Sequence, residues 1–174
     1  MGKKNKGVDL LIEAMNLLIK DGIKARLHLF GGGSLESVIR DKINNYRLDT
    51  YVHINSYCSP TEAVAYLKSC DYLVIPSRVE CIPVIYSDAL KTQTPLLVTD
   101  VGDMGHLTRK FGVGKVVPAN DPIALKDGMK ELVGEQPTVY KSKMKALAQQ
   151  FDLKEIAIRF LCEIEKTNGI SYHS

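Results

Sequence analysis

Apolar, strand-like runs that alternate with helix-like segments are the feature that most constrains the fold of this chain. The segments "DYLVIPS" and "PLLVTD" contain unbroken apolar runs, which are typical of strands buried on both faces. Strands that alternate with helices over short connections form a parallel sheet with right-handed crossovers. The sequence therefore predicts a doubly wound, Rossmann-like α/β domain. Its five predicted strands lie at residues 25–30, 51–54, 71–77, 95–100 and 114–118.

Capping residues mark where several of the intervening helices begin. Ser59, followed by a proline and then by Glu62, predicts a capping box. Ser34 is predicted to cap the second helix, which follows it directly, and Asp121 to cap the first of the helices that close the chain. The chain opens with a helical pattern at residues 8–20, whereas domains of this class open with a central strand. We therefore expect the first strand to be truncated.

Length and composition favour one soluble domain that spans residues 1–174. A chain of 174 residues is long enough for one hydrophobic core and short for two. It has no run of about eighteen apolar residues that would span a bilayer, and its basic opening lacks the apolar region of a signal peptide. The net charge of +3 comes with scattered lysines and offers no basic stripe for a nucleic acid.

The four cysteines and four histidines show no spacing that would bind a metal. No CxxC pair occurs, and no two histidines are one helical turn apart. Free cysteines suit a reducing compartment, so we expect a cytoplasmic protein without a structural metal or disulfide bonds.

Three segments follow predicted strands at the edge of the sheet where ligands bind in this fold class. They are residues 31–34, 77–83 and 99–105. Gly31, Gly32 and Gly33 would let the backbone approach a phosphate or a sugar closely. A plain tight turn explains these glycines equally well, because they lack the GxGxxG spacing of dinucleotide-binding loops.

Two carboxylates, Glu80 and Asp88, flank the start of a predicted helix from Pro83 to Thr92. They are either solvated acids on a loop and a helix surface, or a pair that binds a ligand. Spacing alone leaves both interpretations open.

Five segments in order resemble the C-terminal domain of group 1 (family 4) retaining glycosyltransferases, which have the GT-B architecture. The resemblance runs from Lys6 to about Leu132, and its most specific part is the E-x7-E pattern, on which Glu80 and Asp88 fall. The segments are "KGVDLLIEAM", "LHLFGGGSLES", "CDYLVIPSRVECIPVIYSDAL", "TPLLVTDVGDMGHL" and "GVGKVVPANDPIAL".

The resemblance implies roles for individual residues. Glu80 would lie against the donor sugar, and Lys6 would neutralise the diphosphate as it leaves; these two are the predicted catalytic residues. Asp88 would accept hydrogen bonds from the ribose hydroxyls, and the helix N-terminus would face the diphosphate. The predicted nucleotide-sugar contacts are Gly31, Gly32, Gly33, Tyr57, Cys81, Ile82, Pro83, Val84, Ile85 and Asp88.

The resemblance also implies the partners of the chain. The donor would be a UDP-, GDP- or ADP-sugar, used with retention of configuration and without a metal ion or other cofactor. Such enzymes build polysaccharides, lipopolysaccharides or glycolipids, and their acceptor site lies on an N-terminal domain that this chain lacks. That domain would supply any peripheral contact with a membrane. Alone, the chain is expected to bind a donor weakly and to transfer little sugar.

Departures from the family pattern support an alternative function. Asp88 replaces a glutamate and is one methylene shorter, and "GDMGH" replaces Gly-Gly-x-x-Glu, with His106 in the position of the acid. A degenerate domain that serves as a non-catalytic binding or scaffolding subunit is therefore the second hypothesis. A flavodoxin-like regulatory domain is disfavoured, because no acidic cluster follows the predicted strands.

Overall fold

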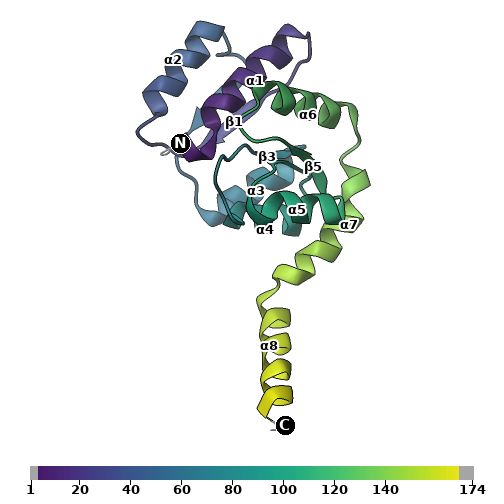
Figure 1. Cartoon of the computed structure of the whole chain (residues 1–174). Coiled ribbons are helices and arrows are strands. Elements are labelled where there is room, and N and C mark those ends of the chain that lie inside the picture. Colours follow the sequence, from purple (N-terminus) through teal and green to yellow (C-terminus); the bar gives the residue numbers. More distant parts are fainter. Residues whose placement is uncertain (1–3, 169–174) are drawn as a thin grey trace.

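The computed structural model describes residues 4–168, in which helices and strands alternate as far as β5 and helices follow it (Figure 1). The elements in chain order are η1 (Lys4–Lys6), α1 (Val8–Lys20), β1 (Leu27–Phe30), α2 (Glu36–Tyr46), β2 (Val52–Asn55), α3 (Pro60–Ser69), β3 (Leu73–Ile75), α4 (Val84–Thr92), β4 (Leu96–Thr99), α5 (Gly102–Phe111), β5 (Gly114–Val117), α6 (Pro122–Gly134), α7 (Thr138–Ala148), η2 (Gln149–Phe151) and α8 (Leu153–Asn168).

All strand pairs are parallel, as the alternating pattern predicts. The strands form two sheets, however, with the orders β1-β2 and β3-β4-β5. Leu27 pairs with Val52 in the first sheet, and Val98 pairs with Ile75 and Val116 in the second. The predicted parallel α/β architecture is confirmed, and within the described residues no backbone ladder joins β1 to β3.

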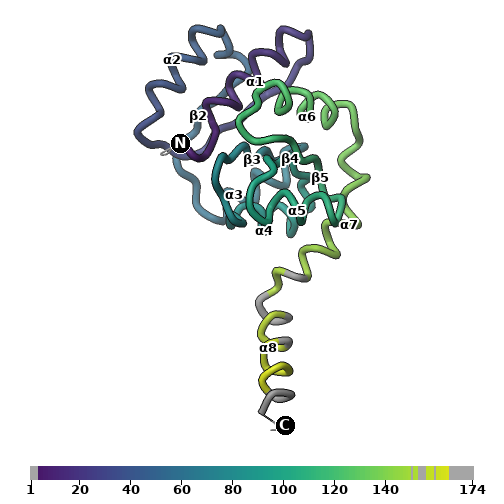
Figure 2. The backbone as a smooth tube through the Cα atoms, in the orientation of Figure 1, coloured from purple at the N-terminus to yellow at the C-terminus, as the bar shows by residue number. Residues whose placement is uncertain are grey.

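Helices cover both faces of the three-stranded sheet. Both α5 and α6 pack against β4 and β5, and Figure 1 shows α6 above these strands and α5 below them. Helix α1 packs against α6 and α2, and α7 packs against α4. The tube in Figure 2 shows α8 leading away from this body, and its apolar side chains at Ile156, Ile158, Phe160, Leu161 and Ile164 are exposed.

The core is centred on β4. Leu96, Leu97 and Val98 are completely buried, which confirms that this strand is covered on both faces. In β3 only Ile75 is buried, while Leu73 and Val74 are half-buried. The expectation of full burial for β3 is wrong because this strand lies at the edge of its sheet and has a neighbour on one side only.

The predicted helix starts are confirmed in two cases and corrected in a third. Ser59 and Glu62 form the reciprocal capping box, and Asp121 accepts two backbone hydrogen bonds at the start of α6. Helix α2 begins at Glu36 without a side-chain cap. Its N-cap is Leu35 rather than the predicted Ser34, and the N–H of Glu36 donates to the carbonyl of Gly33 at 3.0 Å.

The segment before α1 is a 3-10 turn. Lys4–Lys6 adopt this turn rather than an extended conformation, so these residues are not the end of an opening strand.

Candidate functional site

The two residues predicted to be catalytic lie together. Lys6 ends the 3-10 turn before α1, and Glu80 lies in the loop between β3 and α4. The ammonium of Lys6 forms an ion pair with Oε2 of Glu80. The Glu80 side chain is 18% exposed and that of Lys6 is 52% exposed. A half-exposed lysine next to a sheltered carboxylate can exchange its partner for an incoming anion without loss of buried packing.

Two glycines allow neighbouring segments to approach the loop that carries Glu80. Gly7 has a φ of +66°, and a Cβ there would lie 1.8 Å from the carbonyl oxygen of Pro76. Gly102 has a φ of +51°, and a Cβ there would lie 2.3 Å from the carbonyl oxygen of Glu80. The loop is therefore held between the turn before α1 and the start of α5.

Arg78 connects three segments around this loop. Its Nη1 and Nη2 donate to the two carboxylate oxygens of Asp9, each at 2.8 Å. Its Nε donates to Oδ1 of Asn120 at 2.8 Å, and Nη1 also donates to the carbonyl of Lys4. The backbone N–H of Arg78 donates to the carbonyl of Asn5 at 2.6 Å. Every contact made by this side chain joins parts of the chain that are distant in sequence.

The Arg78–Asp9 pair is sheltered enough to shift both pKa values. Burial raises the pKa of Asp9, but the hydrogen bonds and the positive charge of Arg78 outweigh that effect and hold this pKa below its ordinary value. The hydrogen bonds to Asp9 in turn raise the pKa of Arg78. Both groups are therefore charged at neutral pH.

The start of α4 places the predicted phosphate contacts next to Glu80. Pro83 is the N-cap and provides no side-chain cap. Cys81 and Val84 are exposed, whereas Ile82 and Ile85 pack partly against the core. The N–H groups in the first turn of a helix have no carbonyl partner within that helix, so this end can receive an anion.

Asp88 lies one turn after Val84 on α4 and is half-buried. The helix buries Tyr86, Ala89 and Leu90. Because helical positions four residues apart share a face, Asp88 lies on the side of Val84 rather than on the core side.

The glycine turn after β1 is covered by an aromatic ring. The hydroxyl of Tyr57 donates to the carbonyl of Gly32 at 3.1 Å, and a Cβ at Gly31 would lie 3.4 Å from the ring. Tyr57 is nevertheless 80% exposed, and Gly33 is exposed beside it. Gly31, Gly32 and Tyr57 thus form a second cluster. In the described part of the chain, none of the hydrogen bonds of this second cluster reaches Lys6 or Glu80.

Sequence reasoning missed Asp9, Arg78 and Asn120. Arg78 stands in the loop that carries Glu80, but nothing in its spacing indicates a partner 69 residues away. The sequence offered only two weak signals, an acid in the first turn of a predicted helix and an arginine near a predicted site. Both features are common on protein surfaces.

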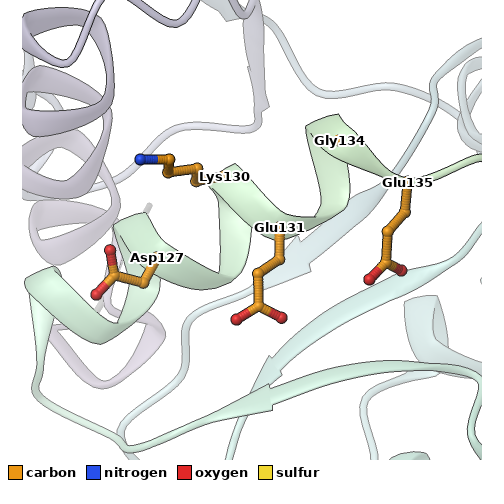
Figure 3. A pocket seen from close by; sticks show the side chains of 5 residues that line it. All are labelled: Asp127, Lys130, Glu131, Gly134 and Glu135. Carbon is orange, nitrogen blue, oxygen red and sulfur yellow. The ribbon is translucent and has the colours of Figure 1, made fainter.

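A hollow over α6 is lined by acidic side chains and one lysine (Figure 3). Its lining residues are Asp127, Lys130, Glu131, Gly134 and Glu135. Lys115 contacts Glu131 at 3.0 Å and Glu135 at 2.7 Å, and hydrogen bonds from Lys115 and Tyr140 hold the pKa of Glu135 below its ordinary value. None of the predicted site residues lines this hollow.

Within residues 4–168, no group of three or more His, Cys, Asp or Glu lies close enough together to hold a metal ion. No helix in this range combines the length and apolar character needed to cross a bilayer.

Solved structures with the same arrangement define the class of the fold as the Rossmann-like half of GT-B glycosyltransferases. Sucrose-phosphate synthase from Thermosynechococcus elongatus superimposes with a TM-score of 0.81 at 20% identity, over 97% of this chain and 44% of that one. Anabaena Alr3699/HepE, solved in complex with UDP, superimposes with a TM-score of 0.80 at 17% identity, over 94% of this chain and 46% of that one.

Sequence comparison then establishes the family. The pattern of the family described as glycosyl transferases group 1 matches residues 2–155, so this chain belongs to that family. An uncharacterized glycosyltransferase of Methanocaldococcus jannaschii is 29% identical over 131 residues, which cover 75% of this chain and 36% of that protein. The chain therefore spans about a third of the length of this relative.

Proposed function

We propose that this chain is the donor-binding domain of a retaining glycosyltransferase. The complete protein would transfer a sugar from a nucleotide diphosphate sugar to an acceptor, in the synthesis of a polysaccharide, lipopolysaccharide or glycolipid. The observation that carries this proposal is the ion pair between Lys6 and Glu80 beside the uncapped start of α4. It puts a cation, a carboxylate and a helix N-terminus at one place, as a sugar diphosphate requires.

Each group has a distinct task in this proposal. Lys6 exchanges Glu80 for the diphosphate, which carries more negative charge, and stabilises that charge as the bond to the sugar breaks. The freed carboxylate of Glu80 accepts hydrogen bonds from the sugar hydroxyls, and Asp88 accepts from the ribose. Tyr57 and the turn at residues 31–33 contact the rest of the nucleotide sugar. Lys6 and the helix dipole balance the phosphate charge without a metal ion.

The remaining parts of the reaction belong to other segments. The acceptor would bind to an N-terminal domain in a longer protein, in agreement with the share of the relatives that this chain spans. That domain would also make any peripheral contact with a membrane. Alone, the chain would bind the donor nucleotide and catalyse little transfer.

Calorimetric titration of the chain with UDP, GDP and ADP, each with and without EDTA, tests this function. We expect one of the three to bind, with an affinity that EDTA leaves unchanged. Lys6→Ala should weaken this binding about tenfold, the loss expected for one charge-assisted contact. Lys126→Ala, which removes the ion pairs with Asp21 and Asp127 away from the candidate site, should have no effect. Failure of all three nucleotides to bind would contradict the proposal.

A further inference from the structure

We infer that Arg78 is a positioning residue that fixes Lys6 for the diphosphate. This inference rests on the proposed function and adds to it a residue that touches neither nucleotide nor sugar. The guanidinium uses Nε, Nη1 and Nη2 on protein partners, which are Asp9, Asn120 and the carbonyl of Lys4. These hydrogen bonds use the guanidinium to join segments of the protein rather than to bind a ligand.

Besides the backbone hydrogen bond from Arg78 to the carbonyl of Asn5, two side-chain connections join the segment of Lys6 to the loop of Glu80. One is the ion pair between Lys6 and Glu80 themselves. The other consists of Arg78, which holds the 3-10 turn through Lys4 and the first turn of α1 through Asp9. When Lys6 leaves Glu80 for a phosphate, the first connection is lost and the second remains. Arg78 therefore keeps the backbone on both sides of Lys6 in place while its side chain changes partner.

Geometry explains why an arginine is suited to this task. The planar guanidinium matches both oxygens of Asp9 and still has Nε free for a third direction. That third bond reaches Asn120, which has a φ of +61° in the turn before α6. The side-chain exposure of Arg78 and Asp9 is 16% and 21%, so solvent competes little for these bonds. A lysine would keep the positive charge, but its single ammonium group could replace only one of these directed hydrogen bonds.

The alternative is that Arg78 only stabilises the fold, and the two roles differ in what they predict for ligands. A positioning role acts through Lys6, so it affects ligands with a diphosphate and spares the parent nucleoside. A structural role affects both ligands alike and does not depend on Lys6. A double-mutant cycle between the two residues separates these cases.

The test measures the affinity of the full chain for the nucleoside diphosphate that binds best and for its parent nucleoside. The variants are Arg78→Ala, Arg78→Lys, Lys6→Ala and the double variant with both Lys6→Ala and Arg78→Ala. Lys126→Ala, which removes an ion pair at the other end of α1, serves as the control. We expect Arg78→Ala and Arg78→Lys to weaken diphosphate binding about tenfold. Nucleoside binding should change less than about twofold. In the Lys6→Ala background, Arg78→Ala should add less than about twofold to the loss of diphosphate affinity.

The possible results divide clearly. Equal losses for nucleoside and diphosphate, or losses that add fully to that of Lys6→Ala, would overturn the positioning role. Diphosphate binding that is unchanged in both Arg78 variants would overturn it as well, while leaving the proposed function intact. If the unmodified chain binds no nucleoside diphosphate, the proposed function fails and this inference fails with it. Arg78→Lys keeps the test decisive if Arg78→Ala does not fold.

Discussion

Gly7 lies so close to Pro76 that a Cβ on this glycine would be 1.8 Å from the carbonyl oxygen of the proline. Its φ of +66° is also a conformation that other residues adopt only with strain. Gly7 follows Lys6 directly, and Pro76 is four residues before Glu80. The contact therefore sets how near the two predicted catalytic residues can come.

Replacing Gly7 tests this packing. We expect Gly7→Ala to lower the free energy of unfolding by at least about 2 kcal/mol, because the left-handed backbone and the clash with a carbonyl both oppose a methyl group. Urea unfolding followed by circular dichroism measures the loss. Gly134→Ala is the matched control, since nothing lies within 4 Å of its Cβ, and it should stabilise α6 by about 0.5 kcal/mol. A Gly7→Ala variant as stable as the unmodified chain would contradict the packing described for this turn.

Acid should weaken the link between Asp9 and Arg78. The pKa of folded Asp9 lies below its ordinary value of 3.8, so folding favours the ionised form. The stabilisation is therefore fully present above pH 3.8 and is lost as the pH falls through the folded pKa. We expect Asp9→Asn to cost about 1 kcal/mol at pH 7 and to differ less from the unmodified chain near pH 3.

Urea unfolding midpoints at several pH values between 7 and 3 give this comparison. Asp49→Asn, a change at an exposed acid before β2, controls for the loss of one negative charge. A stability difference between Asp9→Asn and the unmodified chain that stays constant over this range would exclude the carboxylate as its source.

The length of the side chain at position 88 distinguishes an enzyme from a degenerate binding domain. Asp88→Glu adds one methylene on the side of α4 that carries Val84 and leaves the buried side untouched. If the site binds ribose through this acid, we expect the longer side chain to raise the affinity for the nucleoside diphosphate several-fold, on the order of one hydrogen bond, and Asp88→Ala to lower it. Isothermal titration of the three forms decides between them. Equal affinities for all three would favour the scaffolding alternative.

Local patterns predicted most of the fold, because strands and helix starts depend on neighbouring residues. The capping box at Ser59 and the buried strand β4 follow directly from residue types and spacing. The separation of the sheet into two and the partial exposure of β3 depend on which strands become neighbours, and no local pattern encodes that. The start of α2 lies one residue later than predicted, with Leu35 rather than Ser34 as its N-cap, because the choice between adjacent capping positions depends on the folded backbone.

The candidate site shows the same division. Resemblance to a family predicted catalytic roles for Lys6 and Glu80, which stay predictions, while their ion pair is visible only in the structure. The role of Arg78 depends on Asp9 and Asn120, which meet it only after the chain has folded. Contacts of this kind have no sequence period and become visible only in three dimensions.

The division of the strands into two ladders has a consequence for how the molecule melts. Within the described residues, no hydrogen-bonded ladder joins the half with β1 and β2 to the half with β3, β4 and β5. Cooperative unfolding of the two halves therefore depends mainly on the packing of side chains. Helix α1 supplies them, since it packs against α2 beside one sheet and against α6 beside the other. We therefore expect a change that detaches this helix to reduce the cooperativity with which the two halves unfold.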